Sequence, residues 1–216
     1  MQYVRYSLLT IDGTKKDAFV SKLTALLDDR KGRPGLRAGR VIISNQRPGL
    51  EKEGENRVCI MAMFDDKSSA DANTENVTSL RESLADFLIG DGSPLVREGD
   101  IVWSFDAEGM AERTIMPGYI RHIGLDFDPS KYDAMLAYAD NTVNTLKSVP
   151  GLRRIRVGRV SDEQKIVSIA WDSEELADAA SDNLANAFAG FAEFESNYGE
   201  PRLVAGDLVY AYTRGS

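Results

Sequence analysis

The sequence contains an internal duplication, and this feature limits the available folds more than any other. Three short motifs occur once in each half and in the same order: YVRY at 3–6 and YIRH at 119–122, PGLR at 34–37 and at 150–153, and GDIVW at 99–103 and GDLVY at 206–210. The repeating unit is as long as a small domain. The pattern therefore indicates a domain duplication and not a solenoid of short repeats.

The length of 216 residues allows one large domain or two small ones of about 100 residues each. The duplication favours two halves, a first repeat over 1–107 and a second over 119–216, joined by a linker over 108–118. A half of this size buries only a limited core by itself. We therefore predict that the two halves share an interface.

Charge and cysteine content exclude several classes of protein. The formal net charge of −8 argues against a general nucleic-acid-binding protein and against attraction to anionic membranes. A single cysteine, Cys59, allows no intrachain disulfide, and no apolar run is long enough to cross a bilayer. With no segment that resembles a signal peptide, we expect a cytoplasmic location.

Each half has the pattern β-α-β-β-α-β. In the first half, apolar spacing and turn residues predict strands over 2–11, 37–44, 57–64 and 101–105 and helices over 17–29 and 70–88. In the second half they predict strands over 119–127, 153–160, 165–171 and 208–212, a helix capped by Ser130, and a helix with Leu184, Phe188, Phe191 and Phe194 on its buried side. Such a unit is ferredoxin-like, with both helices on one face of an antiparallel sheet.

Two such sheets can bury their remaining faces against each other. The predicted fold class is therefore α+β, with two ferredoxin-like repeats fused into a dimeric α/β barrel within one chain. Trp103, Tyr210 and Tyr212 stand at alternate positions of the last strands, and we predict them in the barrel core.

The segment IAWDSEEL at 169–176 resembles antibiotic-biosynthesis-monooxygenase-type domains. Those domains form dimeric α/β barrels, and tandem versions occur. The first half has MFDDKSS at 63–69, where Phe64 stands in the place of Trp171. Some members oxidise aromatic compounds without a metal or cofactor, some degrade haem, and others are isomerases. The resemblance implies a site between sheet and helices with a strand-end tryptophan, which Trp171 matches.

His122 is the only histidine and the candidate catalytic residue. As a base or hydrogen-bond donor it could act on a phenolic substrate, and as an axial ligand it could bind haem. A lone histidine is more often a sheet residue satisfied by a neighbour, and that alternative stays open. Gly124, two residues along the same strand face, leaves room for a pocket beside it.

Trp171, Tyr6 and Arg121 are the candidate substrate-binding residues. Trp171 could stack on an aromatic ligand or could simply fill the joint between a strand and a helix. Arg121 is equivalent to Arg5 of the first repeat, and this symmetry fits a shared structural role as well as a chemical one. Because the repeats differ where His122 replaces Tyr6 and Trp171 replaces Phe64, we predict that a single site lies in the second half.

Arginines are concentrated on the second strand of each repeat: Arg37, Arg40, Arg153, Arg154, Arg156 and Arg159. They could bind a carboxylate, but protection of strand edges and pairing with acids on the helices is the favoured interpretation. One histidine and one cysteine cannot build a zinc or thiolate site, and no glycine-rich nucleotide-binding motif is present. We expect no metal and no cofactor.

The sequence supports two main functional hypotheses. The first, implied by the resemblance, is a cofactor-independent monooxygenase that acts on a small aromatic molecule. The second is a non-catalytic small-molecule-binding or structural module of the same fold, and a weaker third is a haem-binding protein that uses His122. We expect a monomer with pseudo-twofold symmetry or a homodimer, without nucleic-acid or membrane partners.

Overall fold

The computed structural model describes residues 1–44, 54–90, 92–107, 116–195 and 202–215. It divides into two compact units: unit 1 comprises Met1–Asp100 and Leu208–Ser216, and unit 2 comprises Ile101–Asp207. Most of the predicted linker over 108–118 falls outside the described residues. The compact units and the sequence repeats therefore differ in their terminal strands.

Both repeats have the predicted element order. The first contains β1 (Tyr3–Asp12), α1 (Lys16–Asp28), β2 (Leu36–Ser44), β3 (Glu55–Phe64), α2 (Lys67–Ala72), α3 (Thr74–Ser83) and β4 (Leu95–Asp106), with short 3-10 turns at Gly13–Lys15 and Ala85–Phe87. The second contains β5 (Tyr119–Asp126), α4 (Tyr132–Leu146), β6 (Leu152–Arg159), β7 (Gln164–Trp171), α5 (Glu174–Ala179), α6 (Ser181–Phe188) and β8 (Arg202–Thr213), with 3-10 turns at Pro129–Lys131 and Ala189–Phe194.

Two details of the helix predictions were wrong. The helix predicted over 70–88 is interrupted at Asn73, whose side chain donates a hydrogen bond to the Ser69 carbonyl and competes with helix continuation. Ser130 does not cap α4. Instead Asp128 accepts a hydrogen bond from the Ser130 N–H and caps a 3-10 turn that leads into the helix.

Hydrogen bonds connect the strands in the order β1-β3-β2-β8-β5-β7-β6-β4, which closes as a barrel. This confirms the predicted fold class. The β1–β3, β2–β3, β5–β7 and β6–β7 pairs are all antiparallel. Strands β4 and β8 serve both units, because residues 95–100 of β4 pair with β1 while residues 202–207 of β8 pair with β5. The last strands are accordingly longer than the predicted 101–105 and 208–212.

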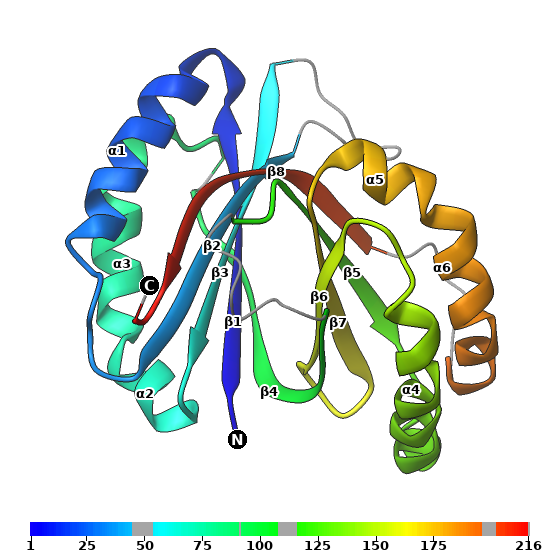
Figure 1. The fold of residues 1–216 in the computed structure, drawn as a ribbon. Coiled ribbons are helices and arrows are strands. Elements are labelled where there is room, and N and C mark those ends of the chain that lie inside the picture. Colours follow the sequence, from blue (N-terminus) through cyan, green and yellow to red (C-terminus); the bar gives the residue numbers. More distant parts are fainter. Residues whose placement is uncertain (45–53, 91, 108–115, 196–201, 216) are drawn as a thin grey trace. The chain divides into compact units, whose positions relative to one another are not determined.

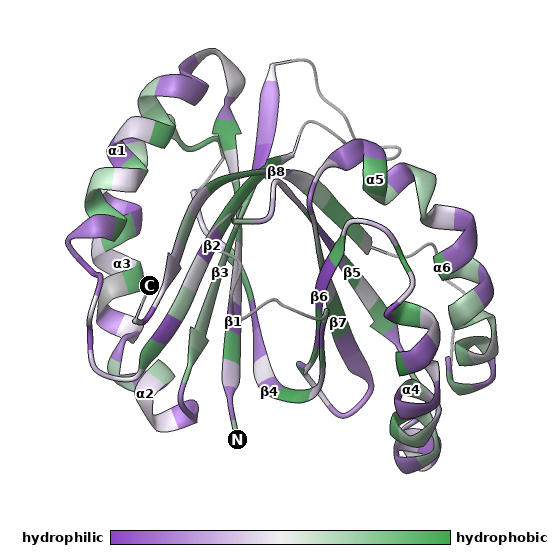
Figure 2. Cartoon of the chain, in the orientation of Figure 1, coloured by the Kyte–Doolittle hydropathy of each residue, from purple (hydrophilic) through white to green (hydrophobic). Residues whose placement is uncertain are grey.

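Each unit buries an apolar cluster between its sheet and its helices. In unit 1, Leu9 and Ile11 of β1 pack with Phe19 and Leu23 of α1 and with Leu84 after α3. Figure 1 shows α1 and α3 along the same face of this sheet. The helices alternate hydrophobic and hydrophilic residues, as amphipathic helices on a sheet do (Figure 2). Burying each large apolar side chain contributes about 1.5–3 kcal/mol.

The prediction that Trp103, Tyr210 and Tyr212 form the barrel core was wrong about the face of the sheet. Trp103 packs on the apolar cluster of unit 2, and its indole Nε1 donates to Asp140 of α4 at 2.9 Å. Tyr210 and Tyr212 pack on the cluster of unit 1 that includes α1. Period-two spacing shows which residues share a face but not which face the helices cover, so the helix side was not identified.

The arginines of the second strands form ion pairs, as predicted, but their partners are not on helices. Arg153 pairs with Asp172 at the end of β7, and both Arg154 and Arg156 pair with Asp106 at the end of β4. The strand ends bring these carboxylates beside the arginines. These pairs join neighbouring strands.

The two Pro-Gly-Leu-Arg motifs have the same local structure. Gly35 and Gly151 have φ of +77° and +73°, values that residues with a Cβ rarely adopt. The backbone N–H of Asp65 donates to the Gly35 carbonyl, and that of Asp172 donates to the Gly151 carbonyl, each at 2.9 Å. A register shift follows in both β2 and β6. The repeated motif therefore specifies a turn and a bulge.

We expect Gly151→Ala to lower the free energy of unfolding by about 2–3 kcal/mol. A Cβ at Gly151 would lie 2.8 Å from the Leu176 Cβ, in addition to the strain of positive φ. Gly32→Ala is the matched control, because Gly32 has φ of +75° and no atom within 4 Å of a built Cβ. Gly32→Ala should lower the free energy of unfolding by about 1 kcal/mol. Equal losses in urea denaturation would contradict the role of helix packing at Gly151.

Candidate functional site

In each unit the described residues line a cavity between the sheet and its helices. The unit 2 cavity has a volume of about 130 Å³ and the unit 1 cavity about 120 Å³. An apolar cavity of about 150 Å³ binds benzene, so each has room for a ligand the size of one ring. Their chemistry differs, because Lys165 and Glu195 line the unit 2 cavity and five arginines line the unit 1 cavity.

The unit 2 cavity is lined mainly by aliphatic and aromatic side chains. Its aromatic residues are Trp103 from β4, Phe188 from α6 and Phe191 from the following 3-10 turn. The charged residues among its described lining are Lys165 and Glu195. Such a lining leaves few polar groups to orient a ligand.

Lys165 is the most unusual residue of this cavity. It stands on β7 opposite Leu125 and is only 3% exposed. Among the described residues its Nζ has one hydrogen-bond partner, the thioether sulfur of Met135 at 3.2 Å, which is a weak acceptor. The ring of Phe191 lies 5.2 Å away. The ring of Phe127 lies 6.0 Å away, so the buried amine is surrounded by a thioether and two aromatic rings, which stabilise its positive charge less than water would.

Burial acts on the pKa of both charged groups. Desolvation lowers the pKa of Lys165, and the negative charge of Glu195 opposes this effect only in part. Desolvation also raises the pKa of Glu195, against the influence of Lys165. Both shifts favour the neutral forms, so a larger fraction of the Lys165 amine is uncharged and able to accept a proton than in an exposed lysine.

His122 lies outside both described cavities. It pairs with Ser168 across β5 and β7, and its Nδ1 lies 2.9 Å from the Ser168 Oγ. Residues alternate between the faces of a strand, so His122 and Lys165 stand on opposite faces of this sheet. Burial lowers the pKa of His122 to about 4, which leaves the imidazole neutral near pH 7.

Two of the other three candidate residues stand on the opposite face of the sheet from His122. Trp171 pairs with Tyr119, on the helix-facing side of the sheet, and belongs to the apolar cluster of unit 2. Arg121 lies on the same side of the sheet. It donates a hydrogen bond to Ser181 of α6 and forms an ion pair with Asp178 of α5. Tyr6 belongs to unit 1. Strand parity therefore separates His122 from Trp171 and Arg121, whereas Tyr6 is the repeat equivalent of His122 and stands on the opposite face of β1 from Arg5.

Sequence reasoning missed Lys165, although a signal was present. Along β7 the residues on one face are Lys165, Val167, Ile169 and Trp171. A charged residue in line with three large apolar ones marks a buried amine or a strand end. Lys165 was interpreted as the start of a strand, where a lysine is ordinary, and so it was not singled out.

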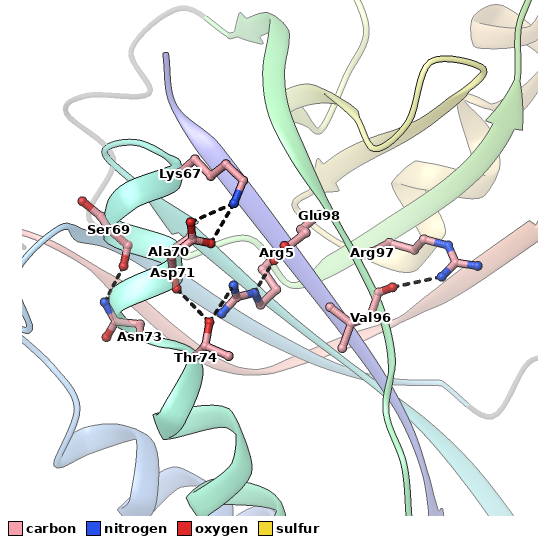
Figure 3. A network of polar contacts seen from close by, with 10 residues as sticks. All are labelled: Arg5, Lys67, Ser69, Ala70, Asp71, Asn73, Thr74, Val96, Arg97 and Glu98. Carbon is pink, nitrogen blue, oxygen red and sulfur yellow. Dashed lines mark hydrogen bonds and ion pairs between the residues drawn. The ribbon is translucent and has the colours of Figure 1, made fainter.

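The unit 1 cavity contains Arg5 of β1, the repeat equivalent of Arg121. The two arginines differ in how their guanidinium groups are used. Arg121 is held by α5 and α6, whereas the Nε of Arg5 pairs with Glu98 at 2.6 Å and its Nη2 donates to Thr74 at 3.2 Å (Figure 3). The Nη1 of Arg5 is buried and has no partner among the described residues.

Two kinds of feature are absent from the described part of the chain. It contains no group of three or more histidine, cysteine, aspartate or glutamate side chains that could hold a metal ion. None of its helices is both long and apolar enough to cross a membrane.

Known proteins resemble this chain in structure and not in sequence. No protein-family model and no curated protein sequence matches it. A "Putative monooxygenase" from Fusobacterium nucleatum aligns with 100% of this chain and 95% of its own, at 10% identity and a TM-score of 0.71. A "putative monooxygenase" from Lactobacillus acidophilus aligns with 99% of this chain and 97% of its own, at 12% identity and a TM-score of 0.68.

An "anthrone oxidase-like protein" aligns with 100% of this chain and 94% of its own, at 14% identity and a TM-score of 0.65. Identities this low show a shared fold and leave activity open. The resemblance noted at 169–176 is thus matched by structural neighbours that cover the full chain. The chain has the tandem dimeric α/β barrel fold of these monooxygenase-like proteins.

Proposed function

We propose that the protein binds a small phenolic molecule in the unit 2 cavity and promotes its oxidation by dioxygen, with Lys165 as the proton acceptor. The observation that carries the proposal is a buried amine in a cavity of about 130 Å³ lined mainly by apolar and aromatic side chains. The structural likeness to monooxygenase-like proteins supports this reaction class by analogy.

The first step is proton transfer. A phenolic hydroxyl within hydrogen-bond distance of Lys165 Nζ would give up its proton to the neutral amine. The resulting phenolate would lie beside an ammonium group in an apolar surrounding, where opposite charges attract more strongly than in water. The rings of Phe188 and Phe191 would hold the substrate ring through aromatic contacts.

The second step uses dioxygen and needs no further reductant. For a hydroquinone, an electron pair of the anion forms a C–O bond to O₂ at a ring carbon, and a proton returns to the peroxide. The O–O bond then breaks, one oxygen atom leaves as water, and the other remains on a hydroxyquinone. The substrate loses four electrons and O₂ gains four, so hydroquinone plus O₂ gives hydroxyquinone plus water.

The decisive experiment is oxygen uptake with hydroquinone and methylhydroquinone, corrected for the rate without protein. Lys165→Met should lower kcat/KM at least about 100-fold, the usual contribution of a positioned base. Lys147→Met removes an exposed lysine of the same unit and should leave the rate unchanged. For the wild type, kcat/KM should rise with pH until Lys165 is fully neutral and then level off.

Other results would assign the function differently. An unchanged rate in Lys165→Met together with a loss in His122→Gln would make His122 the base, as the sequence predicted. Saturable phenol binding without oxygen uptake would favour the non-catalytic binding module.

The haem-binding alternative receives no support from either cavity. His122 lines neither of them, and both volumes are below the range of about 300–1,000 Å³ typical of pockets for larger ligands. Titration with haemin should therefore give no Soret shift that depends on His122.

A further inference from the structure

We infer that unit 1 contains a second ligand site, which binds a small organic carboxylate in the arginine-lined cavity beneath α1 and α3. The inference does not depend on the activity proposed for unit 2. It rests on the charges around the cavity, on two buried guanidinium nitrogens without partners, and on the apolar walls.

All the charged side chains in the described lining of this cavity are positive. Five of its described lining residues are arginines, and none is an aspartate or a glutamate: Arg5, Arg30, Arg33, Arg40 and Arg81. The protein as a whole carries a formal net charge of −8, so this concentration runs against the composition. A one-sign lining with low-dielectric walls attracts ligands of the opposite charge.

Two of these arginines have unused donors. Arg5 is only 6% exposed, and neither its ion pair with Glu98 nor its hydrogen bond to Thr74 involves Nη1 (Figure 3). The Nε of Arg30 is likewise buried and no described residue accepts a hydrogen bond from it, while its Nη1 donates to the Leu26 carbonyl. Unpaired buried donors of charged groups are costly, and an anionic acceptor would satisfy them.

Crowding of cations in this cavity supports the same conclusion. Desolvation lowers the pKa of Arg30, the positive charge of Arg33 lowers it further, and the negative charge of Asp29 opposes these effects only in part. A bound anion would relieve both effects, because it would compensate the guanidinium charge and replace the lost hydration.

The remaining walls select the body of the ligand. Leu9, Val41, Ile60 and Phe64 line the cavity together with the rings of Tyr210 and Tyr212. A volume of about 120 Å³ accommodates one ring or a short branched chain. A free inorganic anion would leave these apolar walls empty, so an aromatic or branched aliphatic carboxylate fits better.

Calorimetric titration with benzoate, benzamide and inorganic phosphate tests the inference. Benzoate should bind at least tenfold more tightly than either of the other two. Arg5→Gln and Arg30→Gln should each weaken benzoate binding about tenfold or more. Arg121→Gln should leave it unchanged, because Arg121 occupies the repeat-equivalent position and lines neither cavity.

Each alternative outcome overturns the inference in a distinct way. Equal affinity for benzoate and benzamide would identify an apolar pocket without anion recognition, and phosphate binding as tight as benzoate would identify an inorganic anion site. Loss of benzoate binding in Lys165→Met, but not in the arginine variants, would place the carboxylate in unit 2. Absence of binding by the wild type would reject the site.

Arg30 is half-buried, so Arg30→Gln keeps the test valid if Arg5→Gln fails to fold.

Failure here and failure of the proposed oxidation can be told apart. Lys165→Met should abolish oxygen uptake and preserve benzoate binding, whereas Arg30→Gln should weaken benzoate binding and preserve oxygen uptake. Each result therefore bears on one unit only.

Discussion

Replacing Trp171 by alanine should lower the free energy of unfolding by about 3–5 kcal/mol, the range for deleting a large buried aromatic side chain. Trp171 is fully buried, at 0% exposure, in the cluster that also contains Tyr119 and Ala177. Its side chain fills the joint between β7 and α5, and alanine would leave a void that neighbours cannot fill completely. Urea denaturation followed by far-UV circular dichroism measures the change.

Trp171→Phe is the matched variant, because phenylalanine stands at the equivalent position of the first repeat as Phe64. The indole Nε1 of Trp171 is buried without a hydrogen-bond partner among the described residues. Phenylalanine therefore loses some packing but also removes an unsatisfied donor, and we expect a loss below about 2 kcal/mol. Unchanged stability in Trp171→Ala, combined with lost phenol binding, would restore the ligand-binding role predicted from the sequence.

The stability of the protein should fall by about 3 kcal/mol through His122 alone as the pH drops from 6.5 to 4. Burial lowers the pKa of His122 from 6.5 to about 4 in the folded chain. Between these values the unfolded chain binds a proton that the folded chain does not, so acid favours unfolding. Each pKa unit corresponds to about 1.4 kcal/mol. Below pH 4 both states are protonated and the loss is complete.

His122→Gln isolates this contribution. Many carboxylates also titrate in this pH range. The pKa of Glu195 is raised in the folded chain, so protonation of Glu195 increases the free energy of unfolding as the pH falls. The difference in unfolding free energy between wild type and His122→Gln cancels these shared effects. Because the chain has one histidine, its imidazole resonances report the pKa directly by NMR. A pKa near 6.5 in the folded protein would rule out the predicted loss.

The fold could be predicted from the sequence because the duplication and the turn residues are local signals. Gly35 and Gly151 need positive φ, and a proline precedes each, so the turns can be recognised without knowing what packs on them. Strand parity followed from the alternation of side chains. The side of the sheet that the helices cover depends on packing between distant segments, and this is why Trp103 and Tyr210 were placed on the wrong face.

The candidate site was less predictable, for a physical reason. Sequence comparison drew attention to positions where the repeats differ, such as His122, and to rare residue types. Lys165 and Arg5 belong to common residue types, and what distinguishes them is burial without adequate partners. Whether a charged group has a partner depends on the folded structure, because residues far apart in sequence can form an ion pair, as Arg5 and Glu98 do across 93 positions. Neither property can be found by spacing along the chain.

Strands β4 and β8 each begin in one compact unit and end in the other. Although the gene is duplicated in series, a break within the linker over 108–118 would therefore not release two complete halves. The amino-terminal piece would lack the strand segment over 208–213, and the carboxyl-terminal piece would lack the segment over 101–106. Each would expose unpaired backbone groups at a sheet edge, the kind of surface that promotes aggregation. A contiguous piece over 101–207 would contain every strand segment of unit 2, whereas unit 1 needs strand segments from both ends of the chain.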